Sequence, residues 1–179
     1  MTDGYERIPA KAGWCEPSRL PRGPNGRALC RQCSTEVPKG SRSFCSPACV
    51  HAWKLTTDPG YQRRELFKRD RGVCTVCGLD TEALNRAFQE ARRAIWREES
   101  AGDPPHNTSS WWDRRDGPTE RLRRLGFLPG QSLWEMDHTV PVVEGGGGCG
   151  LSNLRTLCRP CHLKATRALR ARRSRRARA

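Results

Sequence analysis

Apolar residues are sparse along this chain, and only a few stretches repeat them with a regular period. One stretch, residues 82–99, carries Leu84, Phe88, Ala91 and Ile95 at the spacing of an amphipathic helix. Shorter helices are predicted where a proline opens or a glycine closes a segment, namely Pro47–Leu55, Tyr61–Arg71, Pro118–Leu125 and a last helix from Pro160. Two stretches have strand character, Leu133–Val143 and Leu154–Leu157. This mixture predicts a small α+β protein.

The composition limits the class of protein further. Hydrophobic residues make up 35% of the 179 residues and the mean hydropathy is −0.80, so no membrane-spanning segment is predicted. The first residues, Met1–Lys11, lack the apolar core of a secretory signal, and we expect a cytoplasmic protein. The 33 Lys and Arg residues exceed the 19 Asp and Glu residues, which gives a net charge of +14.

Much of this charge lies at the C-terminal end. The segment Lys164–Ala179 contains eight basic residues and no acidic residue. Such a run is typical of a solvated, partly disordered arm that binds an acidic polymer. Together with an isoelectric point near 10.0 it favours DNA as the partner, with a merely solubilising tail as the alternative.

Ten cysteines in a chain without a predicted secretory signal favour metal sites over disulfides. Eight of them form two sets, each with one pair in a turn and one pair at a helix start: Cys30, Cys33, Cys45 and Cys49, and then Cys74, Cys77, Cys158 and Cys161. Four thiolates delivered in this way predict a structural zinc ion in each set. Buried reduced cysteines or a redox pair are the alternatives, and His51 is an alternative ligand to Cys49. Cys15 and Cys149 receive no role.

Between the pairs of the second set, Asp137, His138, Asn153 and His162 follow the spacing D-H-x14-N-x8-H, with Pro141 and four glycines after the first histidine. Here the sequence resembles the HNH endonucleases, the ββα-metal (His-Me finger) nucleases with a CxxC…CxxC frame. The lead-in from the first cysteine set to Cys74 is similar to the HNH module of SNF2-type annealing helicases. The chain has no Walker A motif, so no NTP is expected.

The residue types agree with phosphodiester hydrolysis, which needs an activated water and a charge that stabilises the phosphorane. Free imidazole titrates near neutral pH, so His138 is the expected general base. Asp137 and His162 supply a carboxylate and an imidazole for a catalytic divalent metal, Mg²⁺ or Mn²⁺. Cys161 and His162 stand about 100° apart on a helix, so one can face zinc and the other the catalytic metal.

The resemblance implies further assignments. It implies that the amide of Asn153 holds the glycine loop and His138 in place without binding metal, and that the products carry 5′-phosphate and 3′-hydroxyl ends. Basic residues near the motif are candidate DNA contacts, or else solvated charges: Arg155, Arg159, Lys164, Arg167, Arg170, Arg172 and Arg173. Trp111 and Trp112, in the predicted loop Ser100–Gly117, either stack on an unpaired base or cover a small core.

We therefore expect an α+β fold with a treble-clef-like ββα-metal core, one structural zinc and a small N-terminal zinc finger with four cysteine ligands. The expected parts are an irregular arm (1–28), the finger (29–58), the nuclease domain (59–167, with a helical insertion at about 80–128) and a basic tail (168–179). The expected activity is metal-dependent cleavage of DNA. A non-catalytic zinc-finger protein that binds nucleic acid, or a protein–protein adaptor, would keep the cysteines without needing Asp137, His138 and His162 together.

Overall fold

The computed structural model describes residues 15–100, 117–128 and 130–178. The chain divides into two compact units, Met1–Glu65 with Gly147–Ser152 and Leu66–Gly146 with Asn153–Ala179. Trp111 and Trp112, most of the predicted loop Ser100–Gly117 and the first half of the predicted N-terminal arm lie outside the described residues. None of the helices in the described ranges combines the length and the apolar character needed to cross a membrane.

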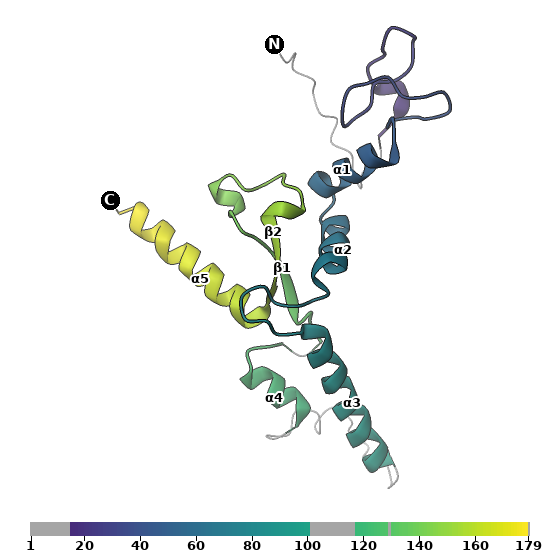
Figure 1. The fold of residues 1–179 in the computed structure, drawn as a ribbon. Helices are drawn as coiled ribbons and strands as arrows, with labels where there is room; N and C mark the ends of the chain where they lie inside the picture. The colour runs from purple at the N-terminus through teal and green to yellow at the C-terminus, as the bar shows by residue number, and fades with distance from the viewer. Residues whose placement is uncertain (1–14, 101–116, 129, 179) are drawn as a thin grey trace. The chain divides into compact units, whose positions relative to one another are not determined.

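The helices and strands follow the predicted order (Figure 1). The five α-helices of the described residues are α1 (Pro47–Thr57), α2 (Pro59–Asp70), α3 (Thr81–Ser100), α4 (Pro118–Arg124) and α5 (Arg159–Arg176). The two strands of the sheet are β1 (Trp134–His138) and β2 (Leu154–Cys158), and short 3-10 turns are η2 (Pro17–Arg19), η3 (Val142–Glu144) and η4 (Leu151–Asn153).

The first unit is a small cysteine-rich finger. Helix α1 begins where predicted, because the Ser46 hydroxyl accepts the Cys49 N–H at 3.2 Å and Pro47 takes the first helical position. Its core is small and includes buried Cys30 among its members. The Glu36 carboxylate accepts hydrogen bonds from the two nitrogens of Asn25, at 2.6 and 2.9 Å, and these bonds lower the pKa of Glu36.

The second unit contains the ββα arrangement. Strands β1 and β2 pair antiparallel, with Asp137 opposite Arg155 and His138 opposite Leu154, and α5 follows β2 directly (Figure 1). Leu157, fully buried, and Cys158 carry the sheet into the core of this unit. The predicted α+β class with a hairpin and a C-terminal helix is confirmed.

Two elements differ from the prediction. Strand β1 ends at His138 rather than at Val143, since Pro141 has no N–H for a ladder and the chain then enters η3. The Arg-rich end, expected to be partly disordered, continues α5 as far as Arg176. Alanine and arginine dominate this stretch, and both have high helix propensity.

Candidate active site

A groove of about 590 Å³ lies between the end of β1, the loop after it and helix α5. Asp137 and His138 reach it from β1, Arg155 from β2 and His162 from the first turn of α5. Successive side chains of a strand point to opposite faces, yet Asp137 and His138 both line the groove. His138 is the last residue of β1, where the regular strand ends. The structure therefore brings Asp137, His138 and His162 to one groove, while Asn153 is not among its lining residues.

The carboxylate of Asp137 has different partners on its two oxygens. Oδ2 accepts a hydrogen bond from Nε of Arg155 at 2.8 Å and forms an ion pair with Nη2 at the same distance. Oδ1 lies 3.9 Å from Nε2 of His162, which is beyond hydrogen-bond distance. One oxygen is thus held by a guanidinium, and the other faces the histidine on α5.

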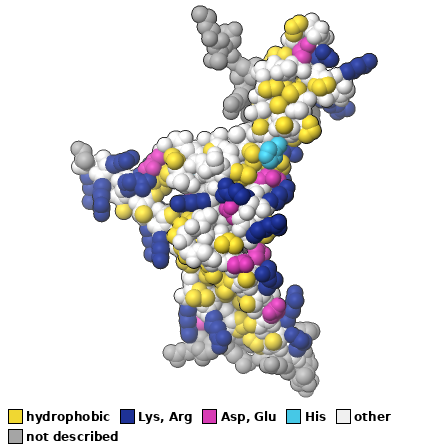
Figure 2. Space-filling model, viewed as in Figure 1, with side chains coloured by type: hydrophobic (Ala, Val, Ile, Leu, Met, Phe, Trp, Pro, Cys, Tyr) yellow, Lys and Arg dark blue, Asp and Glu magenta, His cyan; other side chains and the backbone are white. Residues whose placement is uncertain are grey.

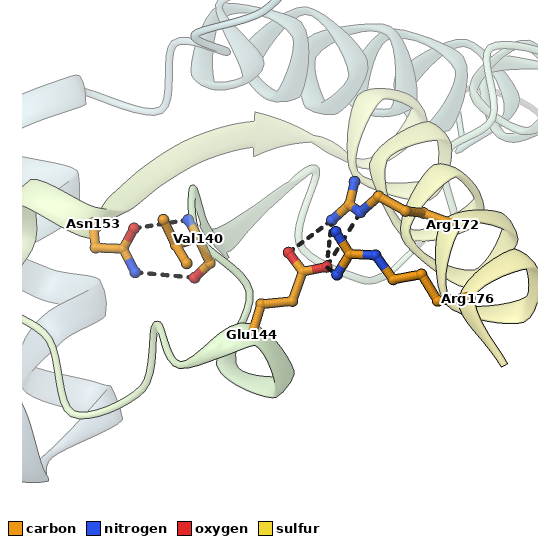
Figure 3. Close-up of polar contacts among 5 residues, drawn as sticks. All are labelled: Val140, Glu144, Asn153, Arg172 and Arg176. Atoms are coloured by element: carbon orange, nitrogen blue, oxygen red, sulfur yellow. Dashed lines mark hydrogen bonds and ion pairs between the residues drawn. The ribbon is translucent and has the colours of Figure 1, made fainter. Parts of the chain in front are cut away.

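Asn153 fixes the loop that follows His138 (Figure 3). Its Oδ1 accepts the Val140 N–H at 2.8 Å, and its Nδ2 donates to the carbonyls of Val140 and Gly146, both at 3.0 Å. The backbone carbonyl of Asn153 also accepts the Thr139 N–H at 2.9 Å. The Asn153 side chain thus links the backbone just after His138 to the glycine loop.

The same loop is attached to α5 at its other end (Figure 3). Glu144 Oε2 lies 2.8 Å from Arg172 Nη2, and Glu144 Oε1 lies 3.7 Å from Arg176 Nη1. Sequence reasoning assigned Arg172 to DNA and did not consider Glu144. No local pattern signals this pair, because 27 residues separate Glu144 from Arg172 in the chain.

The eight paired cysteines form two clusters, as predicted, and the four sulfurs of each cluster lie within 4.8 Å of one another. In the first cluster the Cys45 sulfur is 3.4 Å from that of Cys49 and 3.5 Å from that of Cys33. In the second, the sulfurs of Cys77 and Cys158 are 3.7 Å apart. Sulfurs around a tetrahedral zinc, with bonds of about 2.3 Å, are about 3.8 Å apart. Both clusters have the donors and the spacing that zinc requires.

The cysteines of the first cluster have unequal pKa values. Hydrogen bonds from Thr35 lower the pKa of Cys33 to about 6, whereas the thiol hydrogen bond with Cys49 raises the pKa of Cys45 to about 12. Four sulfurs this close cannot all be negative without a cation among them. A metal ion that binds all four thiolates removes this conflict.

The cysteines of the second cluster also differ in pKa. Burial acts to raise the pKa of Cys74, but backbone N–H groups of Cys158, Cys77 and Val76 outweigh it and bring the pKa to about 6. Burial raises the pKa of Cys158 well above that of a free thiol. N–H groups aimed at a sulfur stabilise a thiolate, the form that binds zinc.

Comparison with known proteins identifies the family of the domain that carries the groove. Residues 126–168 match the family model "HNH endonuclease", and this span includes β1, β2, Asn153 and His162. The chain contains an HNH endonuclease domain. Members of this family are phosphodiesterases.

Curated relatives extend the similarity beyond the HNH match. The "DNA annealing helicase and endonuclease ZRANB3" of Mus musculus is 32% identical over 155 residues, and that of Bos taurus is 31% identical over 151 residues. Each alignment covers 79% of this chain, but the chain spans only 13% of the length of each relative. The crystal structure of the human ZRANB3 HNH domain is 29% identical, with a TM-score of 0.44, and the match covers 69% of this chain and 99% of that chain.

Asp137 and His162 are two side chains lining the groove that could hold a catalytic cation. Two protein donors would leave room around a Mg²⁺ or Mn²⁺ ion for phosphate oxygens and water, which suits a catalytic rather than a closed structural site. Cys161 belongs to the second cysteine cluster, while its neighbour His162 lines the groove. Consecutive residues of a helix point about 100° apart, so the two side chains face different sites.

The remaining candidate residues fall into two groups. Arg159 is half-buried at the start of α5, whereas Lys164, Arg167, Arg170 and Arg173 are exposed along the helix. Figure 2 shows Lys and Arg side chains gathered on the part of the molecule formed by α5.

His51 is not in the first cluster; its Nδ1 lies 2.7 Å from the Tyr61 hydroxyl.

Proposed function

We propose that this chain is a metal-dependent DNA endonuclease whose HNH domain hydrolyses phosphodiester bonds. The observation that carries the proposal is the groove in which Asp137, His138 and His162 meet beside a loop fixed by Asn153. General-base catalysis needs a base that reaches a water next to the phosphate. The groove gives the phosphate and the water access to these side chains. The exposed arginines of α5 supply positive charge for the DNA backbone.

His138 takes the proton of the attacking water in this mechanism. The hydrogen bonds of Asn153 to Val140 and Gly146 hold the backbone that follows His138 and keep the imidazole in position. Asp137 and His162 would hold the catalytic Mg²⁺ or Mn²⁺, and the bound ion would act as a Lewis acid on the phosphate oxygens. The products expected for this family carry 5′-phosphate and 3′-hydroxyl ends.

The two cysteine clusters hold structural zinc in this proposal. Four cysteine donors form a closed site without a position for substrate, so neither cluster takes part in the chemistry. The second cluster instead fixes the first turn of α5 through Cys158 and Cys161, and His162 follows directly. Its zinc therefore positions a catalytic residue.

The decisive experiment measures nicking of supercoiled plasmid by the purified chain, with Mg²⁺ or Mn²⁺ and with EDTA. Cleavage should require the metal, and His138→Ala should lower the rate by about 10²–10⁴-fold, as for a lost general base. DNA affinity measured without added Mg²⁺ or Mn²⁺ should stay within about twofold, because a base contributes to the transition state rather than to ground-state binding. His51→Ala is the matched control, since His51 does not line the groove.

Asp137→Ala and His162→Ala should fail differently from His138→Ala. Both remove a metal donor, so raising the Mn²⁺ concentration should restore part of the rate, whereas it should not rescue His138→Ala. If His138→Ala cuts plasmid as fast as wild type, the catalytic assignment is wrong, and a zinc-finger protein that only binds nucleic acid becomes the better description.

A further inference from the structure

Arg155 lies directly opposite Asp137 in the β1–β2 ladder, and its guanidinium lies in the groove beside the catalytic residues. Its Nε donates a hydrogen bond to Oδ2 of Asp137 at 2.8 Å, and its Nη2 forms an ion pair with the same oxygen, also at 2.8 Å. The Asp137 side chain is 18% exposed and that of Arg155 is 30% exposed. This partial shielding makes the pair stronger than a fully solvated ion pair.

The contact determines which way the carboxylate faces. A carboxylate turns about its last bond in a broad, nearly two-fold potential, so its orientation is set by its partners. With Oδ2 held by Arg155, Oδ1 is the oxygen that points toward His162. We propose that Arg155 is a positioning residue that presents Asp137 Oδ1, together with His162, to the catalytic metal. This inference rests on the proposed function.

The alternative is that Arg155 binds a DNA phosphate, as expected from the sequence. That role would require the guanidinium to leave Asp137 and to break both of the 2.8 Å interactions with Oδ2. It would also place the freed carboxylate oxygen beside the phosphate, and two negative groups at close range repel each other. While Arg155 stays paired with Asp137, its positive charge neutralises the negative carboxylate before a phosphate binds. The geometry therefore favours positioning over phosphate binding.

The test measures metal binding and DNA binding separately, on zinc-loaded full-length protein. Direct Mn²⁺ binding is followed by electron paramagnetic resonance without DNA, with Asp137→Ala as the background. Arg155→Gln should weaken Mn²⁺ binding by about 10–100-fold, the range typical for loss of a residue that orients a metal ligand. Arg155→Lys, which keeps the charge but not the fork of donors, should lie between wild type and Arg155→Gln.

DNA binding is measured as a function of salt, without added Mg²⁺ or Mn²⁺ and without a chelator, so that the structural zinc stays in place. Arg155→Gln should leave the log–log salt slope unchanged, because a positioning residue does not touch phosphate. Arg170→Gln is the matched control: Arg170 is exposed on α5, and its replacement should flatten the slope by about 0.9 while Mn²⁺ binding stays the same. Zinc content and thermal unfolding check that each variant folds, and Arg155→Lys carries the test if Arg155→Gln does not.

Three results would overturn the positioning role. A slope flattened by about 0.9 in Arg155→Gln, with Mn²⁺ binding intact, would make Arg155 a phosphate ligand. Tighter Mn²⁺ binding in Arg155→Gln would make it a competitor of the metal. No Mn²⁺ binding by wild type above the Asp137→Ala background would remove the site itself. The plasmid assay reports separately, so a chain that binds Mn²⁺ through Arg155-oriented Asp137 but cuts no DNA would refute only the proposed endonuclease activity.

Discussion

At the scale of single residues, the active-site loop depends on a glycine as much as on the polar side chains. A Cβ at Gly146 would meet the backbone carbonyl of Val140 and would lie 2.7 Å from Nδ2 of Asn153. Both groups belong to the hydrogen-bonded arrangement that follows His138. Because the first obstacle is backbone, the clash cannot be relieved by turning a side chain.

Gly146→Ala should therefore displace the loop and slow cleavage. Loss of a hydrogen bond from a partly buried amide costs about 1–3 kcal/mol, which corresponds to a rate reduced roughly 5- to 150-fold if it acts on the transition state. Gly150→Ala is the control, since a Cβ there meets nothing within 4 Å and its φ is not in the left-handed region. Plasmid nicking rates of the two variants check this; equal rates would show that the loop tolerates the shift.

At the scale of elements, α5 links the parts of the site. Its first turn carries Cys161 and His162, and Arg172 follows ten residues later, about 15 Å along the helix axis. Arg172 and Arg176 face Glu144 at the far end of the groove. The arginines of this helix are therefore not equivalent: two have a carboxylate partner within the HNH domain, and their charge is already partly compensated.

This difference predicts unequal contributions to DNA binding. Replacing the exposed Arg170, Arg173, Arg175 and Arg178 with Gln should flatten the log–log salt slope by up to about 3.6, at about 0.9 for each phosphate contact. Replacing Arg172 and Arg176 should change the slope by less than about 0.9 per residue, because Glu144 competes with phosphate for them. Titrations without added Mg²⁺ or Mn²⁺ at several salt concentrations measure both. If the fourfold variant keeps the wild-type slope, the helix end only improves solubility.

At the scale of the whole molecule, the two cysteine clusters join segments that lie far apart in the sequence. The second cluster closes a loop of 80 residues between Cys77 and Cys158, which is entropically costly. Thr75 N and Oγ1 both donate to the Thr156 carbonyl, at 2.9 and 3.1 Å, and bring the first cysteine turn to β2. Structural zinc adds about 10–16 kcal/mol of apparent binding free energy to such a site.

Purified protein should therefore contain about two zinc ions per chain. Cys158→Ser should lose one zinc and unfold the HNH domain, because Cys158 is also a buried member of its core. Cys33→Ser should lose the other zinc while the HNH domain keeps its fold, because Cys33 belongs to the other compact unit. Elemental analysis and circular dichroism measure these outcomes. Folded, active protein without zinc would contradict the prediction.

The sequence determined most elements of this protein, because their signals are local. Ser46 and Pro47 start α1 as predicted, and apolar residues at helical spacing mark α3. The cysteine pairs indicated both clusters, since a turn and a helix start are recognisable within a few residues each. The end of β1 was predicted five residues too late, because β-branched residues continue past His138 and hide the effect of Pro141.

Only the tertiary structure decided the partners of the charged residues. Asp137 and Arg155 are 18 positions apart in the chain, and they meet because the β1–β2 register places them opposite each other. Glu144 meets Arg172 because the loop after β1 returns to α5. A long charged side chain carries no local mark of its partner, since its contacts are set by the packing of elements distant in sequence. The sequence thus indicates which chemical groups the HNH domain has, and the fold decides which of them hold one another and which face the groove.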